Sequence, residues 1–393
     1  MRILILSNKI PFPADDGSSI AMAQLLKNCV DTGHEVSYAA LNTAKHYKKR
    51  HDFPAELAEQ IDLHTFNVNT TPTVFGALKN LLFSNKPYHT IRFYQNKLVE
   101  HLSGYGPNHF DLTIIEGAFM ADYLDDLTYI SARVVLRAHN VEHFIWSRTR
   151  EQIKNPLKKA YLSIQEERLK RFEQTKAMAV DQVWCLSKLD ERWFRTMGGT
   201  AKWLPVSVDH TEELTQLATM SCFHLGAMDW LPNRMGVNWL LSEVWPLVLE
   251  QIPEAKLHLA GNKFPADIRS NKEKHVVVHG RVKDAKQFAQ THGIALIPLL
   301  SGSGMRIKAL DNASWGVPMI STPIGTEGVF NNPEEAHFVG ESPNEFAQWI
   351  IHGLKSSADC LEKASFARRE IEQHYSSESV CERLQMLCSS IAL

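Results

Sequence analysis

The sequence predicts an α/β protein made of two Rossmann-like domains that face each other across a cleft. Three observations predict this fold class. The 393 residues exceed what one hydrophobic core usually organises. The chain opens with a strand, a loop, a helix and a second strand, the order that builds a parallel sheet. The same order restarts near residue 205, after a linker-like stretch at residues 204–209.

The first half begins with the apolar run at residues 3–6, which has the length of a buried strand. A loop containing Pro and Gly follows, and apolar residues at helical spacing then run from Ala21 to Val30. Gly33 is suited to cap the end of this helix. Further strands are expected at residues 36–40, 112–115, 134–136 and 183–186.

The second half repeats this organisation. Strands are expected at residues 223–225, 257–260, 276–279, 295–298 and 319–321, and a helix from about 233 to 250. The chain from about residue 343 onward is predicted to be mostly helical. Open parallel sheets bind ligands at the carboxyl ends of their strands, so a ligand is expected there in both halves.

Composition excludes several classes of protein. Lys and Arg total 42 against 44 Asp and Glu, a net charge of −2 that argues against a dedicated nucleic-acid binder. The six cysteines form no CxxC pair and no zinc-finger spacing, and we expect free thiols in a reducing compartment. No secretory signal or membrane span is apparent, so a cytoplasmic protein is expected.

The loop that leads into the helix near residue 307 has the residues of an anion site. Gly302 and Gly304 let the backbone approach a ligand closely, and a helix start offers free N–H groups. Arg306 and Lys308 add two cations, which suits a diphosphate, and Asp311 could accept both hydroxyls of a ribose. The alternative is a Ser-capped surface helix with a Lys308–Asp311 pair.

Residues 302–311, with 315–322 and 325–328, resemble the donor-site signature of glycosyltransferase family 4, whose members have the GT-B fold. Residues 226–233 are similar to the family's first strand–loop–helix in the C-terminal domain, and residues 280–282 to its base-binding loop. Residues 16–18 and 33–36 resemble its opening unit, and residues 136–142 a loop that carries a functional His. The resemblance implies transfer of a sugar, with retention of anomeric configuration, from a UDP- or GDP-sugar to a glycan, lipid-linked or small-molecule acceptor.

The resemblance also implies roles for particular residues. The expected catalytic residues are His139, Arg306 and Lys308. The expected donor-binding residues are Gly17, Ser18, Arg281, Val282, Ser303, Gly304, Met305 and Asp311. His139 would face the donor sugar, and its alternative role is to cap the following helix. Gly17 and Ser18 would point N–H groups at the diphosphate, and their alternative role is turn formation.

The sequence departs from the family pattern at two places. The family usually has two Glu residues separated by seven others; the first falls on Ser303 and the second on Asp311. The family's Arg and Lys after the first C-domain strand are also missing, with only Arg234 nearby. We therefore hypothesise that Arg306 and Lys308 neutralise the diphosphate.

No cofactor and no metal are expected. The sequence contains Asp15-Asp16 and Asp125-Asp126 but no DxD motif, so cations and a helix start would stabilise the leaving group. The departing phosphate itself would assist the incoming hydroxyl. Two other functions stay open. One is a nucleotide-sugar epimerase; the other is a non-catalytic GT-B subunit that binds a partner, which the change at Ser303 motivates.

The resemblance divides the chain into an acceptor-binding domain at residues 1–205, a nucleotide-sugar-binding domain at 206–375, and a C-terminal helix at 376–393 that packs back on the first domain. Acceptor choice is assigned to loops 42–54 and 83–94. A basic helix expected at residues 151–178, together with basic residues at 45–50, could contact the inner membrane face. A solvated helix face is the alternative for this segment.

Overall fold

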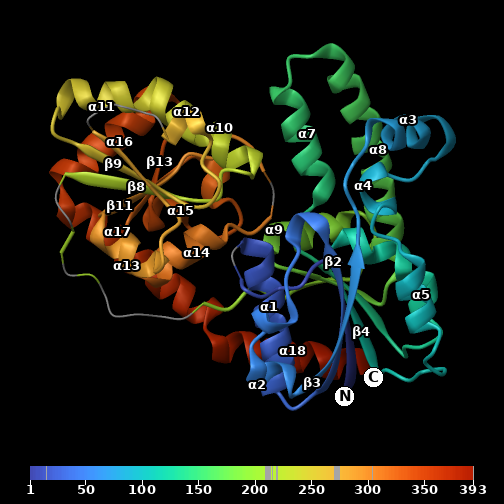
Figure 1. The fold of residues 1–393 in the computed structure, drawn as a ribbon. Helices are drawn as coiled ribbons and strands as arrows, with labels where there is room; N and C mark the ends of the chain where they lie inside the picture. Colours follow the sequence, from blue (N-terminus) through green and yellow to red (C-terminus); the bar gives the residue numbers. More distant parts are fainter. Residues whose placement is uncertain are drawn as a thin grey trace. The chain divides into compact units, whose positions relative to one another are not determined.

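The computed structural model describes residues 1–14, 16–208, 214, 216–217, 220–269, 275–302 and 304–392, without the side chains of residues 50 and 392. The chain forms two compact units (Figure 1). The first unit comprises Met1–Ser207 and Val380–Leu393, and the second comprises Val208–Ser379. Across the described chain, no helix has both the length and the apolar character that crossing a membrane requires.

The first unit is built on a seven-stranded parallel sheet with the order β3-β2-β1-β4-β5-β6-β7. Its strands are β1 (Arg2–Ser7), β2 (Glu35–Thr43), β3 (Ile61–Val68), β4 (Leu112–Glu116), β5 (Val134–Ala138), β6 (Gln182–Cys185) and β7 (Ala201–Trp203). Alternate side chains of a strand point to opposite faces of its sheet. Ile3 and Ile5 accordingly join one buried cluster, and Leu4 and Leu6 join another.

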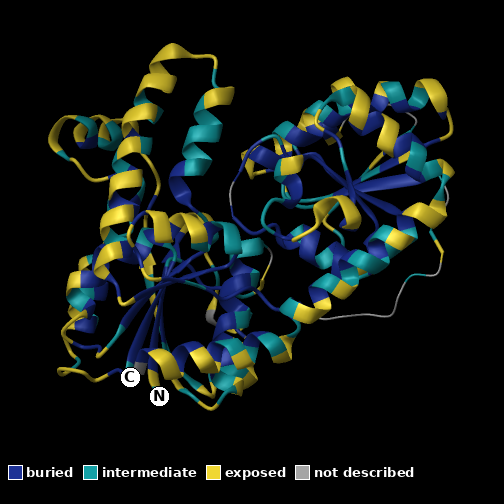
Figure 2. Cartoon of the chain, turned by 180° about the vertical axis from the view of Figure 1, so that it is seen from behind, coloured by how far each residue is buried: buried dark blue, intermediate teal, exposed yellow. Residues whose placement is uncertain are grey.

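Helices cover both faces of this sheet, and Figure 2 shows the buried strands between them. They are α1 (Gly17–Asp31), η1 (Ala44–His46), η2 (Arg50–Asp52), α2 (Ala55–Ala58), α3 (Val74–Phe83), α4 (Tyr88–Ile91), α5 (Asn96–Leu102), η3 (Ala118–Tyr123), α6 (Leu124–Leu127), α7 (Glu142–Gln152), α8 (Pro156–Ala179) and α9 (Lys188–Thr196).

The last helix, α18 (Ser377–Ala392), brings the chain back to the first unit at Val380. Leu384 and Leu387 join the buried cluster that contains Leu25 of α1. The Arg133 guanidinium donates a hydrogen bond to the carbonyl oxygen of Ile391 at 3.0 Å. Both chain ends therefore lie at the same side of this unit (Figure 1).

The second unit is built on a six-stranded parallel sheet with the order β10-β9-β8-β11-β12-β13. Its strands are β8 (Ser221–Leu225), β9 (Lys256–Ala260), β10 (Val276–Gly280), β11 (Ile294–Ile297), β12 (Met319–Ser321) and β13 (Phe338–Val339). Its helices are α10 (Leu231–Trp239), η4 (Leu240–Val244), α11 (Trp245–Gln251), α12 (Ala266–Arg269), α13 (Ala285–Thr291), α14 (Ile307–Ser314), η5 (Pro323–Thr326), α15 (Pro333–Ala336), α16 (Pro343–Lys355) and α17 (Ser357–Tyr375).

Two expected helices differ from the prediction. The helix expected at residues 151–178 is wrong as a single element, because α7 ends at Gln152 and α8 begins at Pro156. Asn155 caps α8, and proline fits the first turn because that position needs no donor. The helix expected near 233–250 contains a π-helical segment, η4, before Pro246, which has no backbone N–H to continue the regular pattern.

Both sheets have the doubly wound order in which the first strand lies beside the second on one side and the fourth on the other. The predicted class, two Rossmann-like parallel α/β domains, is confirmed. The strand order reverses between β1 and β4 in the first unit and between β8 and β11 in the second. Ligands of such sheets bind beside the carboxyl ends of the strands at this reversal.

Candidate active site

The start of α14 lies where the strand order of the second sheet reverses. Gly302 and Gly304 in the preceding loop have φ angles of 118° and 79°, which favour glycine. A Cβ at Gly302 would also lie 3.2 Å from the Arg306 guanidinium. Arg306 takes the N-cap position, but its side chain makes no capping bond to the helix. Ser303 lies outside the described residues.

Arg306 is almost fully buried beside this helix start. Its Nε donates to the carbonyl oxygen of Ile324 at 3.1 Å, and its Nη2 lies 4.0 Å from a carboxylate oxygen of Glu327. These contacts hold the guanidinium in one place. Gly304 and Met305, which precede it, are also buried, so the loop can offer a ligand its backbone groups rather than large side chains.

Lys308 lies in the first turn of α14, and its Nζ donates to Asn233 Oδ1 at 2.6 Å. Asn233 in turn donates from Nδ2 to the carbonyl oxygen of Ala227 at 2.9 Å. This bond joins α14 to α10 and to the loop after β8. Burial, together with a smaller contribution from the positive charge of Arg306, lowers the pKa of Lys308 to about 7. A bound anion would favour the charged ammonium again.

Asp311 lies three residues beyond Lys308 on the same helix. Burial raises the pKa of its carboxyl to about 7. Near neutral pH this group exchanges readily between the acid and the carboxylate. It could therefore accept hydrogen bonds from a sugar hydroxyl in one form and donate one in the other.

His224 of β8 is a polar residue of this site that sequence reasoning missed. It is fully buried, and its Nδ1 lies 2.9 Å from the carbonyl oxygen of Leu296. The Nδ1 therefore carries the proton, and Nε2 is left as an acceptor with no hydrogen-bond partner in the described chain. Burial lowers the pKa of His224 to about 3, with a further contribution from the charge of Lys308.

Arg281 and Val282 follow β10, at the outer edge of the same sheet. The Arg281 side chain is exposed and that of Val282 is half-buried. The structure thus brings Arg306, Lys308 and Asp311 together on one helix. It places Arg281 and Val282 at the end of another strand, and His139, Gly17 and Ser18 in the first unit.

His139 follows β5 at the carboxyl edge of the first sheet. Its Nε2 lies 2.5 Å from Glu116 Oε2, and the other carboxylate oxygen accepts from Arg137 Nη1 at 3.1 Å. Arg137 also donates to the carbonyl oxygen of Ala21 in α1 at 2.9 Å. The three side chains are buried, so Glu116 fixes the orientation of the His139 ring.

The charges in this cluster compensate one another. Burial alone would raise the pKa of Glu116, but the Arg137 guanidinium and His139 outweigh it and hold the pKa below its usual range. Glu116 is therefore a carboxylate at neutral pH, and it accepts a hydrogen bond from the protonated Nε2 of His139. The alternative role of His139 as a helix cap is wrong, because Glu173 accepts from the first N–H groups of α7, at 2.7 and 3.0 Å.

The start of α1 carries its own carboxylate. Asp16 accepts from the Ser19 N–H at 2.9 Å and from the Ser18 hydroxyl at 3.0 Å. Lys9 Nζ lies 2.7 Å from Asp16, forming an ion pair. Burial would raise the pKa of Asp16, but Lys9 lowers it below its usual range. Gly17 and Ser18 thus begin a helix in which one N–H group of the first turn already has a hydrogen-bond partner, the Asp16 carboxylate.

The chain is similar in sequence and in fold to known glycosyltransferases. Residues 220–356 match the family model of the glycosyl transferases group 1. The whole chain superposes on sucrose-phosphate synthase from Thermosynechococcus elongatus, with a TM-score of 0.71, 15% identity and coverage of 100% of this chain and 99% of that one. It also superposes on the pneumococcal O-GlcNAc transferase GtfA in complex with UDP and GlcNAc, with a TM-score of 0.67, 10% identity and the same coverage. The chain has the GT-B fold.

Two further proteins are similar to this GT-B chain, one in structure and one in sequence. HepE from Anabaena, in complex with UDP-glucose, has a TM-score of 0.64 and 13% identity over 99% of this chain and 100% of that one. A protein from Klebsiella pneumoniae, described as an uncharacterized 44.6 kDa protein in the cps region, is 23% identical over 395 residues. The alignment covers 96% of this chain and 97% of the relative. The matched domain and the fold together support a glycosyltransferase.

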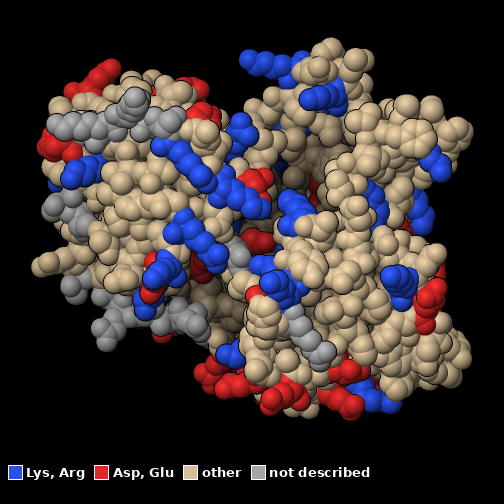
Figure 3. Space-filling view, viewed as in Figure 1, with Lys and Arg blue, Asp and Glu red and all other residues tan. Residues whose placement is uncertain are grey.

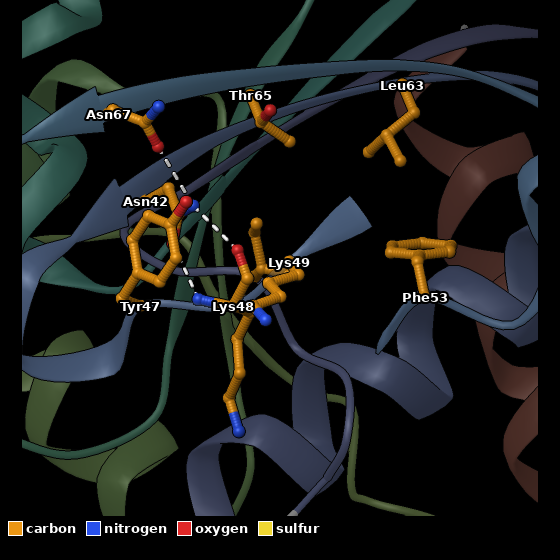
Figure 4. A pocket seen from close by; sticks show the side chains of 9 residues that line it. Asn42, Tyr47, Lys48, Lys49, Phe53, Leu63, Thr65 and Asn67 are labelled. Carbon is orange, nitrogen blue, oxygen red and sulfur yellow. Dashed lines mark hydrogen bonds between the residues drawn. The ribbon is translucent and has the colours of Figure 1, made fainter. Parts of the chain in front are cut away.

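The N-terminal unit of the GT-B fold also contains a cavity of about 250 Å³ at the carboxyl edge of β2 and β3 (Figure 4). Asn42 donates to the carbonyl oxygen of Lys48 at 2.8 Å and to Asn67 Oδ1 at 3.0 Å, which holds the loop after β2 against β3. Phe53 and Leu63 form its apolar side. The remaining lining residues are Ile10, Tyr47, Lys49 and Thr65.

Proposed function

We propose that this protein is a retaining glycosyltransferase that moves a sugar from a nucleotide-diphosphate donor to a carbohydrate or lipid-linked acceptor. The observation that carries the proposal is the pair of cations, Arg306 and Lys308, at the start of α14. They lie inside the segment that matches the glycosyl transferases group 1. A buried Arg306 beside a half-buried Lys308 is well suited to an anionic ligand, because burial disfavours both charges in its absence.

The proposed chemistry follows from the charges of the reaction. The bond between the anomeric carbon and the diphosphate oxygen breaks, leaving negative charge on the diphosphate. Arg306, Lys308 and the free N–H groups of α14 would stabilise that charge. The acceptor oxygen forms the new bond on the same face, and its proton passes to the departing phosphate. The transfer would require no metal, so EDTA is expected to leave it unaffected.

Three further groups receive roles in this proposal. His139, oriented by Glu116, would face the donor sugar and donate or accept a hydrogen bond to it. Asp311 would bind the ribose hydroxyls. The loop at Arg281 and Val282 would hold the base through its backbone. The observation that supports a precise role for His139 is its rigid pairing with a fully buried carboxylate.

The cavity beside β2 and β3 is our candidate for the acceptor site. It lies in loop 42–54, the region that the sequence assigns to the acceptor. Lys48 and Lys49 line it, next to an apolar wall, so an acceptor with an anionic group and an apolar part would fit. HepE complexes contain UDP and glucose, and the relative in a cps region supports polysaccharide biosynthesis as the setting.

Helix α3 supports a peripheral membrane contact. Its side chains Val74, Phe75 and Phe83 are each about four-fifths exposed or more, and Leu78 and Leu82 are more than half exposed. Figure 3 shows a largely uncharged surface over this helix. Exposed apolar surface of this kind marks an interaction site. We infer that α3, rather than the basic face of α8, enters the interface of an anionic membrane.

A vesicle experiment tests the membrane contact. Wild-type protein should cosediment with vesicles of phosphatidylglycerol and phosphatidylethanolamine, and the double variant Phe75→Ser/Phe83→Ser should not. The double variant Lys158→Ser/Lys159→Ser on α8 is the matched control and should retain binding. Equal binding of wild type and the Phe75→Ser/Phe83→Ser variant would contradict this assignment.

The enzymatic proposal is tested by incubating the purified protein with a panel of UDP- and GDP-sugars and candidate acceptors, with and without EDTA. We expect one donor to release its nucleoside diphosphate only when an acceptor is present. Conversion of the donor sugar without acceptor would favour an epimerase. Binding of a nucleotide without any turnover would favour the non-catalytic subunit and would point to the residue at Ser303.

A further inference from the structure

Three histidines gather at the edge of the second sheet, and none of them belongs to the residues assigned to the diphosphate. His258 lies on β9, His279 on the edge strand β10, and His292 at the C-terminal end of α13. Each offers one ring nitrogen, and these nitrogens all lie within 4.8 Å of one another. His258 and His292 are half-buried and His279 is exposed, so the cluster is open to solvent.

The strand register builds this cluster. Val277 pairs with His258, and the register shifts between Val278 and Gly280, so His279 is the extra residue of a bulge. The ring of His279 lies beside that of His258, with centroids 5.2 Å apart. Helix α13 covers the neighbouring part of the sheet, where Phe288 packs edge-on against Phe223 with ring centroids 5.6 Å apart. The ring of His292 stacks on Phe288 at 4.2 Å. The third histidine is thereby held against the first two.

The ring nitrogens are oriented as ligands would be. His258 Nδ1 and His279 Nε2 approach each other to 2.9 Å. His292 uses Nδ1 to donate to the carbonyl oxygen of Phe288 at 2.7 Å, which leaves Nε2 with a free lone pair. A backbone carbonyl that accepts from the second nitrogen of a histidine is the usual support of a metal-binding imidazole.

We propose that His258, His279 and His292 bind a divalent transition-metal ion of the zinc class. Zn²⁺ bound to imidazole at about 2.0–2.1 Å in tetrahedral geometry separates its ligand nitrogens by about 3.3 Å, which small side-chain rotations can reach. Imidazole suits Zn²⁺, Ni²⁺ and Cu²⁺ and not the hard ions Mg²⁺ and Ca²⁺. Three protein ligands leave the fourth position to a solvent molecule.

The proposed ion has a structural consequence. Residues 280–284 connect His279 of β10 to the first residue of α13, and His292 follows the last residue of α13. An ion on the three rings would cross-link β9, β10 and α13, and it would fix both flanks of the loop that contains Arg281 and Val282. None of the residues assigned to the diphosphate belongs to the cluster, so the ion takes no part in the proposed transfer step.

The test uses untagged full-length protein, because a polyhistidine tag would bind the same ions. Wild-type protein should bind one equivalent of Zn²⁺ by calorimetry, and Co²⁺ should give the visible absorption of a four-coordinate nitrogen-ligated ion. His279→Ala and His292→Ala should each weaken Zn²⁺ binding at least tenfold. His275→Gln, just before the same edge strand, is the matched control and should bind as wild type does.

Three results would overturn the proposal. The first is Zn²⁺ binding by the double variant His279→Ala/His292→Ala as tight as that of wild type, and the second is no binding by wild type at all. The third is a cobalt-thiolate charge-transfer band, which would place the ion on cysteine. Both measurements are made without nucleotide, so their failure is independent of the proposed transferase activity.

Discussion

In each unit a helix start lies beside the reversal of strand order, but the two follow different strands: α1 follows β1, and α14 follows β11, which corresponds to β4. In the first unit, α1 begins with Asp16, whose carboxylate caps the helix and pairs with Lys9. In the second unit, α14 begins with Arg306 and Lys308, and no side chain of its N-cap residue satisfies its first turn. One helix start carries its own anion, and the other carries two cations. The local charges, rather than the fold alone, are therefore our reason for proposing the diphosphate site at α14.

The carboxyl groups of Glu116 in the first unit and Asp311 in the second show the same contrast. Glu116 is paired with Arg137 and His139, and its pKa lies below the usual range despite burial. Asp311 has no such compensation, and burial raises its pKa to about 7. A paired carboxylate stabilises the fold, whereas a carboxyl group whose pKa burial raises to near neutral pH is available to a ligand.

The largest expected effect compares these two carboxyl groups directly. Glu116→Gln should lower the free energy of unfolding by about 3–5 kcal/mol, because it leaves the Arg137 guanidinium buried without its counter-charge. Asp311→Asn should be neutral or slightly stabilising, and more so at pH 8 than at pH 6. The reason is that the raised pKa of Asp311 makes its ionisation cost stability as pH rises from about 4 to about 7. Urea unfolding at both pH values measures this, and similar losses in both variants would contradict the contrast.

The second prediction concerns the diphosphate. Arg306→Ala should weaken UDP or GDP binding by about 10- to 100-fold, because a hydrogen bond to a charged group contributes about 1.5–3 kcal/mol. Binding of the bare nucleoside should change little. Calorimetry with the nucleoside and its diphosphate measures the difference, and Arg234→Ala on α10 serves as a control cation. An equal loss for nucleoside and diphosphate would remove Arg306 from this role.

The third prediction uses the lowered pKa of Lys308. Because burial holds this pKa near 7, the free protein must take up a proton to bind an anion at higher pH. Diphosphate affinity should therefore fall by up to about tenfold between pH 7 and pH 8. Lys308→Arg keeps its charge over this range and should flatten the profile. A wild-type profile that is already flat would show that Lys308 does not meet the diphosphate.

The smallest expected effect concerns the start of α1. Asp16→Ala removes the cap, and the loss of the cap alone should cost about 1 kcal/mol of stability. Asp16→Asn keeps an oxygen that can cap the helix, and it should recover most of that loss in a denaturant titration. If Asp16→Asn destabilised as much as Asp16→Ala, the ion pair with Lys9 would be the dominant contribution, and the cap would matter less than the geometry indicates.

The sequence predicts the framework well, because apolar runs of strand length report burial directly. The strands at residues 3–6 and 257–260 and the helical C-terminal part agree with the structure. The strands it left out are β3, β7 and β13, which lie at the sheet edges and are half-buried or very short. The gap before Pro156 and the π-helical segment before Pro246 interrupt regular α-helices whose apolar spacing is continuous.

The candidate site was predictable only where its residues are contiguous. Residues 302–311 combine glycines, cations and a carboxyl group within one loop and helix, so their pattern is visible. Glu116 and Arg137 become neighbours of His139 only through the pairing of β4 with β5, which places Glu116 opposite Arg137. His224 reads as a core histidine until the structure shows its unpaired Nε2. The histidine cluster likewise depends on strand register and on the position of α13.

The most direct test of the central claim is a crystal structure of the protein with a bound nucleoside diphosphate, UDP or GDP, whichever binds. The diphosphate should lie at the start of α14, with Arg306 and Lys308 within hydrogen-bond distance of its oxygens and Asp311 near the ribose. A diphosphate bound elsewhere in the second unit, or held at the start of α1 without Arg306 and Lys308, would contradict the central claim.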